Sequence, residues 1–444
     1  MKRLLIALGA TAVLMGAPSG VFAQGGSTMP YQGIFNNGNG RDTDPNVHHR
    51  LDLTFSVAAG YDDDVLPSLT GGIDPTSKPF NGYNNTYTGT AQYAWQGRKM
   101  QAGLTATSAL RQYTEFNDYT MTHAVGAGFA MQFARRTTLF VNQSANYSPP
   151  YLFGLFPDVN PVTPGDIIAG GPNYVLDDTE SLSYESIVTV EHGLTRRGTI
   201  SVSGDYRYTD FLDNSRGRPD VSSSGLRSQY SYAFGRNTAF TAGYHYRSGE
   251  LGFGTTAVTS EQGLDIGLEY SRRLSPTRRA TLNFSVGSST MDLPSVPAAG
   301  IVEGRQSEVS AEAALTYQFS RTWLLRGAYR RGAEFVAELS YPVFVDGVTA
   351  TLTGDMGRRV HYSSSAAYST GQGLQPGTQQ NLVTYTGDVR LSFDLARRLS
   401  SFVEYLYYSY DFSQNPLLTL GIVNRVERNG ARAGLSLWFT MRRR

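Results

Sequence analysis

The chain has 444 residues, no cysteine, and 38 basic against 37 acidic side chains, which is a formal net charge of +1 at pH 7. The lack of cysteine excludes disulfides and thiolate metal sites, and the balanced charge gives no sign of a nucleic-acid partner. Glycine (48), tyrosine (28) and phenylalanine (22) are abundant, a composition that suits a large β structure better than a helical one.

The first 23 residues have the pattern of a secretory signal peptide. A basic start precedes an apolar run from Leu4 to Met15, and small residues lead to Ala23. The run is too short to cross a membrane as a helix, so we expect export and cleavage after Ala23. Residues 24–49 are rich in Gly, Asn and Pro, and we interpret them as a flexible periplasmic extension.

The next segment is the first of about eighteen with a hydrophobic period of two residues. In "LDLTFSVAAGY", Leu51, Phe55 and Tyr61 share one face, whereas Asp52 and Ser56 share the other. Most segments have about 10–15 residues, longer than the five or six of soluble strands. At ~3.3 Å per residue and a tilt near 40°, eleven residues rise roughly 28 Å, which crosses the apolar band of an outer membrane.

Short and long connections alternate between these segments. Eight are short and carry Arg; nine are longer and rich in Gly, Pro, Asn and Asp. The long ones fall at 62–82, 112–118, 148–179, 212–221, 250–257, 290–304, 333–346, 371–379 and 413–424. This asymmetry is typical of bacterial outer-membrane barrels. We predict an all-β fold: a transmembrane antiparallel β-barrel of about 18 strands over residues 50–440, with both termini periplasmic and a basic tail at 441–444.

The predicted location is the outer membrane of a Gram-negative-type bacterium, with membrane lipids and lipopolysaccharide as surroundings. Arginine at the short turns could then reach phosphate headgroups while its stem covers apolar surface; alternatively, it is merely a soluble turn residue. The predicted periplasmic turns contain Arg98, Arg135, Arg136, Arg196, Arg197, Arg236, Arg321, Arg358, Arg359, Arg397 and Arg398.

The C-terminal sequence "ARAGLSLWFTMRRR" is similar to the last strand of outer-membrane barrels. That strand commonly closes on an aromatic residue, which the barrel-assembly machinery recognises. Here Trp438 and Phe439 stand before a short basic end. We therefore expect this machinery to be a partner.

The polar faces of the strands predict a lumen lined by charged side chains, because a barrel of this size is wide enough to hold water. Such side chains either screen solutes by a transverse field or pair with one another and stiffen the wall. Both signs occur in similar numbers, so strong ion selectivity is not indicated. The predicted lumen-lining residues are Glu185, Asp205, Arg207, Arg227, Asp265, Glu269, Glu308, Glu312, Arg326, Arg330, Asp388, Arg390, Glu404, Arg428 and Arg432.

The longest connection, 148–179, is also the most apolar. A solvated loop gains nothing from such side chains unless they pack somewhere. One hypothesis is that the loop folds into the lumen and constricts it; the alternative is a lid over the rim or a contact with a neighbouring subunit. The residues concerned are Tyr151, Leu152, Phe153, Leu155 and Phe156.

Metal binding and catalysis have little support. The run Asp62-Asp63-Asp64 could hold Ca²⁺ but lacks an EF-hand pattern, and the pair His48-His49 could bind a transition metal. His123 is predicted on the lipid face, where a lipid hydrolase would need it, yet no serine nucleophile motif accompanies it. We predict no catalytic site, no metal and no cofactor.

The first strand and the loop after it, "LDLTFSVAAGYDDDVLPS", resemble the start of outer-membrane β-barrel porins of the type found in exopolysaccharide gene clusters. There a strand ends in a Gly-Tyr-Asp-Asp-Asn-like motif. Gly60, Tyr61, Asp62 and Asp63 match, and Asp64 stands in place of Asn. The resemblance implies an outer-membrane channel that serves export of a polysaccharide or other surface polymer, with export components as partners, and it brings no catalytic residues.

Three functions are thus open: a passive channel, a structural or adhesive barrel whose lumen is closed by loops, and an outer-membrane enzyme. A soluble β-helix or large sandwich is the structural rival. It would bury its apolar faces against each other and would show no alternation of short and long connections.

Overall fold

The computed structural model describes residues 48–63, 82–114, 118–148, 181–212, 220–252, 256–275, 278–293, 304–334, 343–373, 381–411 and 425–443. This part of the chain forms eighteen strands in one sheet. Within it, no helix is long and apolar enough to cross a membrane. The predicted signal peptide, Asp64 and the predicted constriction residues 151–156 lie outside the described residues.

The strands are long, between 11 and 20 residues each. Their bounds are β1 His49–Asp62, β2 Gly82–Gln96, β3 Met100–Tyr113, β4 Asp118–Ala134, β5 Thr137–Ser148, β6 Ser181–Gly193, β7 Gly198–Phe211, β8 Val221–Ala233, β9 Thr238–Gly252, β10 Thr256–Ser275, β11 Arg278–Leu293, β12 Gly304–Gln318, β13 Leu324–Glu334, β14 Val343–Asp355, β15 Val360–Gly373, β16 Asn381–Ala396, β17 Leu399–Asp411 and β18 Arg425–Arg443.

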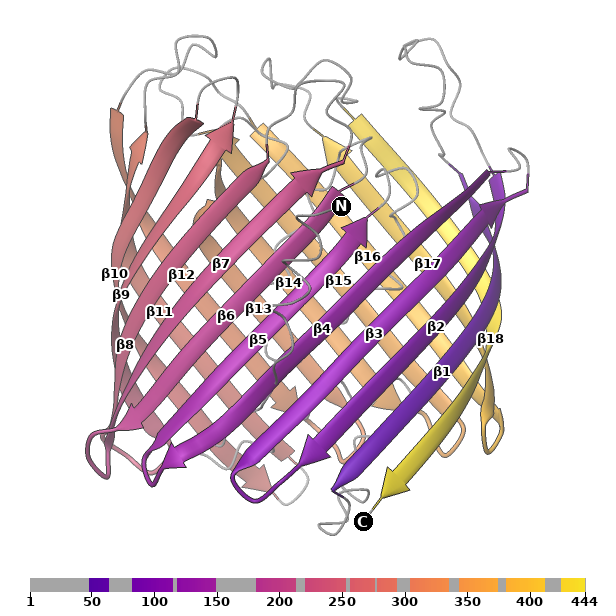
Figure 1. The fold of residues 1–444 in the computed structure, drawn as a ribbon, viewed down its shortest axis with the longest axis horizontal. Helices are drawn as coiled ribbons and strands as arrows, with labels where there is room; N and C mark the ends of the chain where they lie inside the picture. Colours follow the sequence, from indigo (N-terminus) through magenta and orange to yellow (C-terminus); the bar gives the residue numbers. More distant parts are fainter. Residues whose placement is uncertain are drawn as a thin grey trace, which may run out of the picture.

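Every strand pairs antiparallel with its neighbours in sequence, and β1 pairs with β18, so the sheet closes into a tilted barrel (Figure 1). Closure removes the free edges that an open sheet would expose. The predicted basic tail is wrong in one respect: Met441, Arg442 and Arg443 belong to β18 and pair with Leu51, Arg50 and His49. They continue the strand because β1 extends equally far and offers them backbone partners.

The outer surface of the barrel is apolar, as the two-residue period predicts. Large apolar side chains that would be buried in a soluble protein stand exposed on it, such as Leu264 (66%), Ile266 (61%) and Phe55 (54%). Leaving so many of them in water would be costly, whereas a hydrocarbon surround favours them. A closed barrel with this outer band is an outer-membrane β-barrel, and the predicted antiparallel barrel of 18 strands is confirmed.

Aromatic side chains gather near both ends of this outer face. Towards the long-loop end, Tyr61 contacts Tyr83 with ring centroids 5.2 Å apart, and Tyr368 contacts Tyr385 at 5.0 Å. Towards the other end, Phe319, Trp323 and Tyr362 form a chain of ring contacts at 5.8–5.9 Å. Girdles of amphipathic rings mark the two interfaces of an outer-membrane barrel, so the apolar band lies between them.

The short connections all lie at one end of the barrel, the lower end in Figure 1, which we call the short-turn end. Several predicted turn arginines extend the ladder there through their backbone. The carbonyl of Arg136 accepts from Gly193, and that of Arg398 accepts from Trp438 at 3.0 Å. The Arg398 guanidinium also lies 5.6 Å from the Phe439 ring centroid. A role of these side chains at lipid headgroups stays a prediction.

A close approach at the lower girdle supplies a first test of the fold. The indole of Trp323 lies against Gly354, and a Cβ at that position would clash with the ring. We expect Gly354→Leu to lower the free energy of unfolding by about 1–3 kcal/mol through overpacking. The matched control is Gly327→Leu in the neighbouring strand, where the nearest atom to an added Cβ is 3.9 Å away. Urea unfolding in lipid vesicles measures both; equal losses would contradict the packing.

Candidate functional site

The antiparallel register relates the faces of neighbouring strands. It assigns fourteen of the fifteen predicted lumen-lining residues, all except Arg428, to the face opposite the apolar belt. Direct pairs on that face include Glu185 with Arg207, Glu312 with Arg330, and Glu404 with both Arg390 and Arg432. For Arg428 only the strand position is described. What these residues do to a solute stays a prediction.

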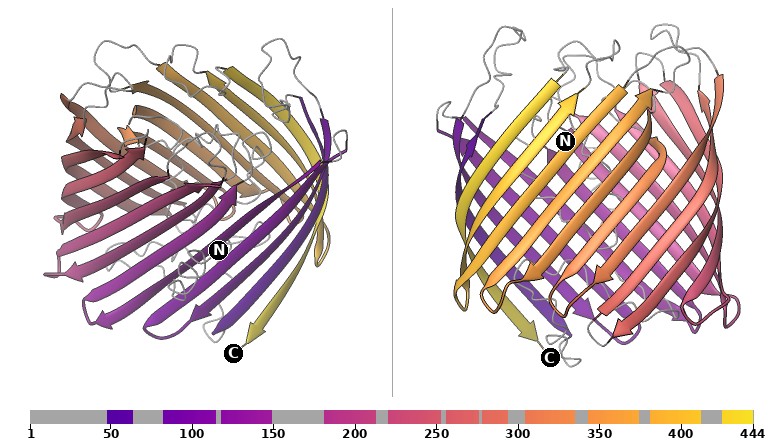
Figure 2. Two further views of the ribbon diagram at one scale, coloured as in Figure 1. Left: turned by 45° about the horizontal axis from the view of Figure 1, so that its top comes forward. Right: turned by 180° about the vertical axis from the view of Figure 1, so that it is seen from behind.

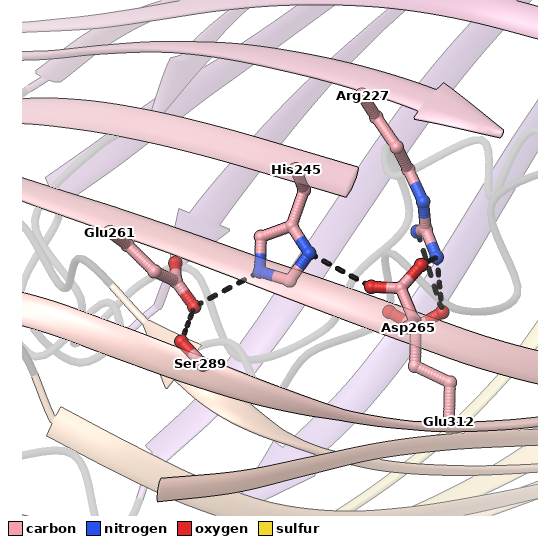
Figure 3. A network of polar contacts seen from close by, with 6 residues as sticks. All are labelled: Arg227, His245, Glu261, Asp265, Ser289 and Glu312. Atoms are coloured by element: carbon pink, nitrogen blue, oxygen red, sulfur yellow. Dashed lines mark hydrogen bonds and ion pairs between the residues drawn. The ribbon is translucent and has the colours of Figure 1, made fainter. Parts of the chain in front are cut away.

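The first group of charges on this face spans β8 to β12 and is called the β8–β12 cluster: Arg227, His245, Glu261, Asp265, Ser289 and Glu312 (Figure 3). The imidazole of His245 lies between two carboxylates. Its Nδ1 is 2.9 Å from Asp265 Oδ1, and its Nε2 is 3.6 Å from Glu261 Oε1. Glu261 also accepts a hydrogen bond of 2.5 Å from Ser289 Oγ.

The local sequence makes room for this arrangement. Glu261, Gly263 and Asp265 follow one another on the same face of β10, and the ring of His245 from β9 lies across the middle position. A Cβ on Gly263 would overlap the imidazole, so glycine there allows His245 to reach both acids. The pairing of Gly263 directly with His245 sets this register.

Arg227 joins the cluster from β8. Its Nη2 lies 3.2 Å from Asp265 Oδ2 and 3.5 Å from Glu312 Oε2 on β12. Four strand spacings of about 4.8 Å separate β8 from β12 along the sheet. Side chains that far apart meet only on the concave side of a curved sheet, so the β8–β12 cluster faces the interior of the barrel.

The second group, called the β16–β18 cluster, contains Arg390, Phe402, Glu404 and Arg432. Arg432 donates to Glu404 Oε2 from both Nη2 (2.7 Å) and Nε (3.0 Å), and Arg390 donates to the same oxygen at 3.3 Å. The Arg390 guanidinium lies 3.9 Å from the Phe402 ring centroid, close enough for a cation–π contact. Glu404 and Arg432 are buried, so two guanidinium groups share the Glu404 carboxylate away from bulk water.

Other charged positions differ in their partners. Arg207 donates from Nε to Oε1 of Glu185 on the neighbouring strand at 2.6 Å, and Ser365 donates to Asp388. In the part of the chain that the structure describes, Arg326 and Glu269 make no ion pair. The inner face therefore combines closed ion pairs with charges that are left available.

Three features of the inner face were missed at the level of sequence. His245 and Glu261 were not singled out, although Glu261 shares the face of Asp265 in an alternating strand. Phe402 was missed because an aromatic side chain was expected on the outer face. Near the short-turn end, His361 was missed too: its two ring nitrogens lie 2.8 Å from Asp355 Oδ1 and 3.1 Å from Asp394 Oδ2.

The candidate metal and catalytic residues have other surroundings. Asp63 accepts two hydrogen bonds from Asn429, at 2.5 and 2.8 Å, which tie the end of β1 to β18. His49 Nδ1 lies 2.7 Å from Tyr93 Oη. His123 is on the outer face and contacts the Tyr147 ring at 5.9 Å. Among the described residues, no three His, Asp or Glu side chains gather as a metal site.

Among known proteins, the chain is similar to solved structures. No family model matches the chain, and no curated sequence does. OccK2 (OpdF) of Pseudomonas aeruginosa in complex with glucuronate is 9% identical, with 88% of this chain and 98% of that chain covered and a TM-score of 0.43. OccAB3 of Acinetobacter baumannii is 12% identical (88% and 99% covered, TM-score 0.41).

The outer membrane protein OprD of Pseudomonas aeruginosa is 11% identical, with 88% of this chain and 94% of that chain covered and a TM-score of 0.41. The likeness to these proteins concerns barrel architecture alone. A function for this chain has to follow from its own residues.

Proposed function

We propose that this barrel is a passive outer-membrane channel for small hydrophilic solutes, with its short-turn end towards the periplasm. An enzyme is not proposed. Outer-membrane lipid and lipopolysaccharide surround the apolar belt in this proposal, and the barrel-assembly machinery inserts it.

The observation that carries the proposal is the β8–β12 cluster. Three carboxylates, one guanidinium and one imidazole gather on the concave face of a barrel whose convex face is apolar. A dry interior would favour apolar side chains there, because every buried charge carries a desolvation cost. Ionised groups at this density are favoured when water and dissolved ions reach them, which is the condition of a conducting lumen.

Single-channel recording tests the proposal. The purified mature protein in a planar bilayer with KCl on both sides should produce discrete conductance steps. Heat-unfolded protein from the same preparation is the control, because detergent alone can produce irregular leaks. Repeated insertion of the folded barrel without any steps would exclude the channel and favour a structural or adhesive barrel.

A finer proposal is export of a polysaccharide or another surface polymer. Its support is the resemblance of residues 60–63 to the first strand of porins from exopolysaccharide gene clusters. Liposomes loaded with a neutral oligosaccharide and with KCl separate the two versions. Release of both supports polymer passage, whereas release of KCl alone restricts the channel to small solutes.

A further inference from the structure

The wall of the barrel separates between β12 and β13 near the long-loop end. Backbone pairing of these strands runs from Gln318 with Leu324 up to Ala311 with Arg331. Beyond that point, β12 continues to Gly304 and stays paired with β11. β13 continues to Glu334 and stays paired with β14. Among the described residues, the β12 segment 304–310 therefore has no ladder partner on its β13 side.

The end of the β13–β14 pair, residues 331–334 and 343–346, is called the hairpin end. Its outward face can be identified from the register. Arg330 pairs with Glu312 on the inner face, so Arg331 and Ala333 belong to the outer face, together with their partners on β14, Asp346 and Phe344. Farther down this face, Val348 is 47% exposed, as expected for the apolar belt.

At the hairpin end the outward-facing apolar side chains are buried. Ala333 is 2% and Phe344 8% exposed, and both belong to one buried cluster with Met291 and Leu293 of β11. Met291 pairs with Glu261, a member of the β8–β12 cluster, so it lies on the inner face of the wall. The outer face of the hairpin end thus packs against the inner face of β11, which a continuous wall does not permit.

The side chain of Arg331 also reaches from the hairpin end to β12. Its Nε donates to the carbonyl of Val309 at 3.1 Å, and its Nη2 lies 3.7 Å from Oε2 of Glu308. Val309 is part of the unpaired β12 edge, so the guanidinium satisfies a backbone acceptor that β13 has left. Asp346 of the hairpin end holds the same guanidinium in place, since Nη1 of Arg331 lies 2.6 Å from Asp346 Oδ2.

We infer that the hairpin end lies on the lumen side of β11 and β12 and constricts the outer mouth of the channel. Arg331 holds it there through its contacts with β12. The inference rests on the proposed channel function. β13 and β14 stand in the near wall in the right-hand view of Figure 2. The buried apolar cluster holds the hairpin end inward, while Arg331 closes the gap it leaves in the wall.

Paired cysteines locate the hairpin end, and the chain has no native cysteine to interfere. Glu308→Cys with Arg331→Cys should be joined by a short bis-methanethiosulfonate reagent in the intact barrel, because the two native side chains reach each other at their charged ends, 3.7 Å apart. In a fully paired wall, Glu308 and Arg331 would lie on opposite faces, and Ser310→Cys with Gly332→Cys would form a direct disulfide instead. The control is Ala314→Cys with Ala328→Cys, directly opposite each other below the separation.

The constriction is tested on the same proteins by conductance. The crosslinked Glu308→Cys/Arg331→Cys barrel should show a loss of conductance that dithiothreitol reverses, and the control crosslink should show none. A direct disulfide between positions 310 and 332, or a crosslinked 308–331 barrel that conducts like its reduced form, would overturn the inference. A third outcome is that the 308–331 crosslink forms but neither the variants nor the wild-type barrel conducts. The channel proposal and the constriction would then both fail, while the placement of the hairpin end would still be established.

Discussion

Replacing Glu404 by Gln is expected to destabilise the barrel more than any other single change of an inner charge. Glu404 is the shared acceptor of Arg390 and Arg432, and Arg432 is only 5% exposed. Without the carboxylate, both guanidinium groups lose a charged hydrogen-bond acceptor where access to water is poor. Removing one partner of a buried ion pair costs about 3–5 kcal/mol, and we expect a loss of this size in the free energy of unfolding.

Urea unfolding in lipid vesicles, followed by tryptophan fluorescence, measures the loss. The matched control is Glu185→Gln, which breaks the partly exposed pair with Arg207 and should cost about 1 kcal/mol or less. The double variant Glu404→Gln/Arg432→Met also removes one of the two guanidinium groups that had shared the carboxylate, and it should recover part of the stability. Equal losses for the Glu404 and Glu185 variants would show that the β16–β18 cluster is not effectively buried.

The second large effect is expected on ion selectivity. The double variant Asp265→Asn/Glu312→Gln removes two negative charges from the β8–β12 cluster and leaves Arg227 without its carboxylate partners. The lumen becomes more positive there, so the permeability ratio of K⁺ to Cl⁻ should fall. One unit charge about 4 Å from an ion in water contributes about 1 kcal/mol, with opposite signs for K⁺ and Cl⁻. The partition of each ion should therefore change roughly fivefold, and the permeability ratio about 25-fold, per charge at that distance.

Reversal potentials in a KCl gradient measure this ratio. The effect should shrink at 1 M salt, where the Debye length falls to about 3 Å. Asp292→Asn is the matched control, because Asp292 pairs with Arg305 on the outer face, both of them well exposed. An Asp292 variant that shifts the potential as much as the double variant would place the cluster away from the ion path.

The barrel could be predicted from the amino-acid sequence. A two-residue hydrophobic period can be read from neighbours along the chain, and segments too long for soluble strands need no tertiary information to recognise. The alternation of short and long connections then gives an even strand number, and the nine predicted long connections coincide closely with the gaps between the observed strands. The faces of Asp265, Glu312 and Arg330 follow from the same alternation.

The tertiary structure alone decided which inner charges meet. Arg227 reaches Glu312 because the wall curves, and His245 reaches Glu261 because Gly263 lies between two acids. The pattern of residues within one strand shows neither the curvature of the wall nor the register between strands. The inward packing of the hairpin end goes further. Ala333 and Phe344 fall in the predicted long connection 333–346, and the observed register assigns them to the outer face, yet they are buried against Met291 and Leu293. Alternation specifies the two faces of a strand, whereas long-range packing decides what each face touches.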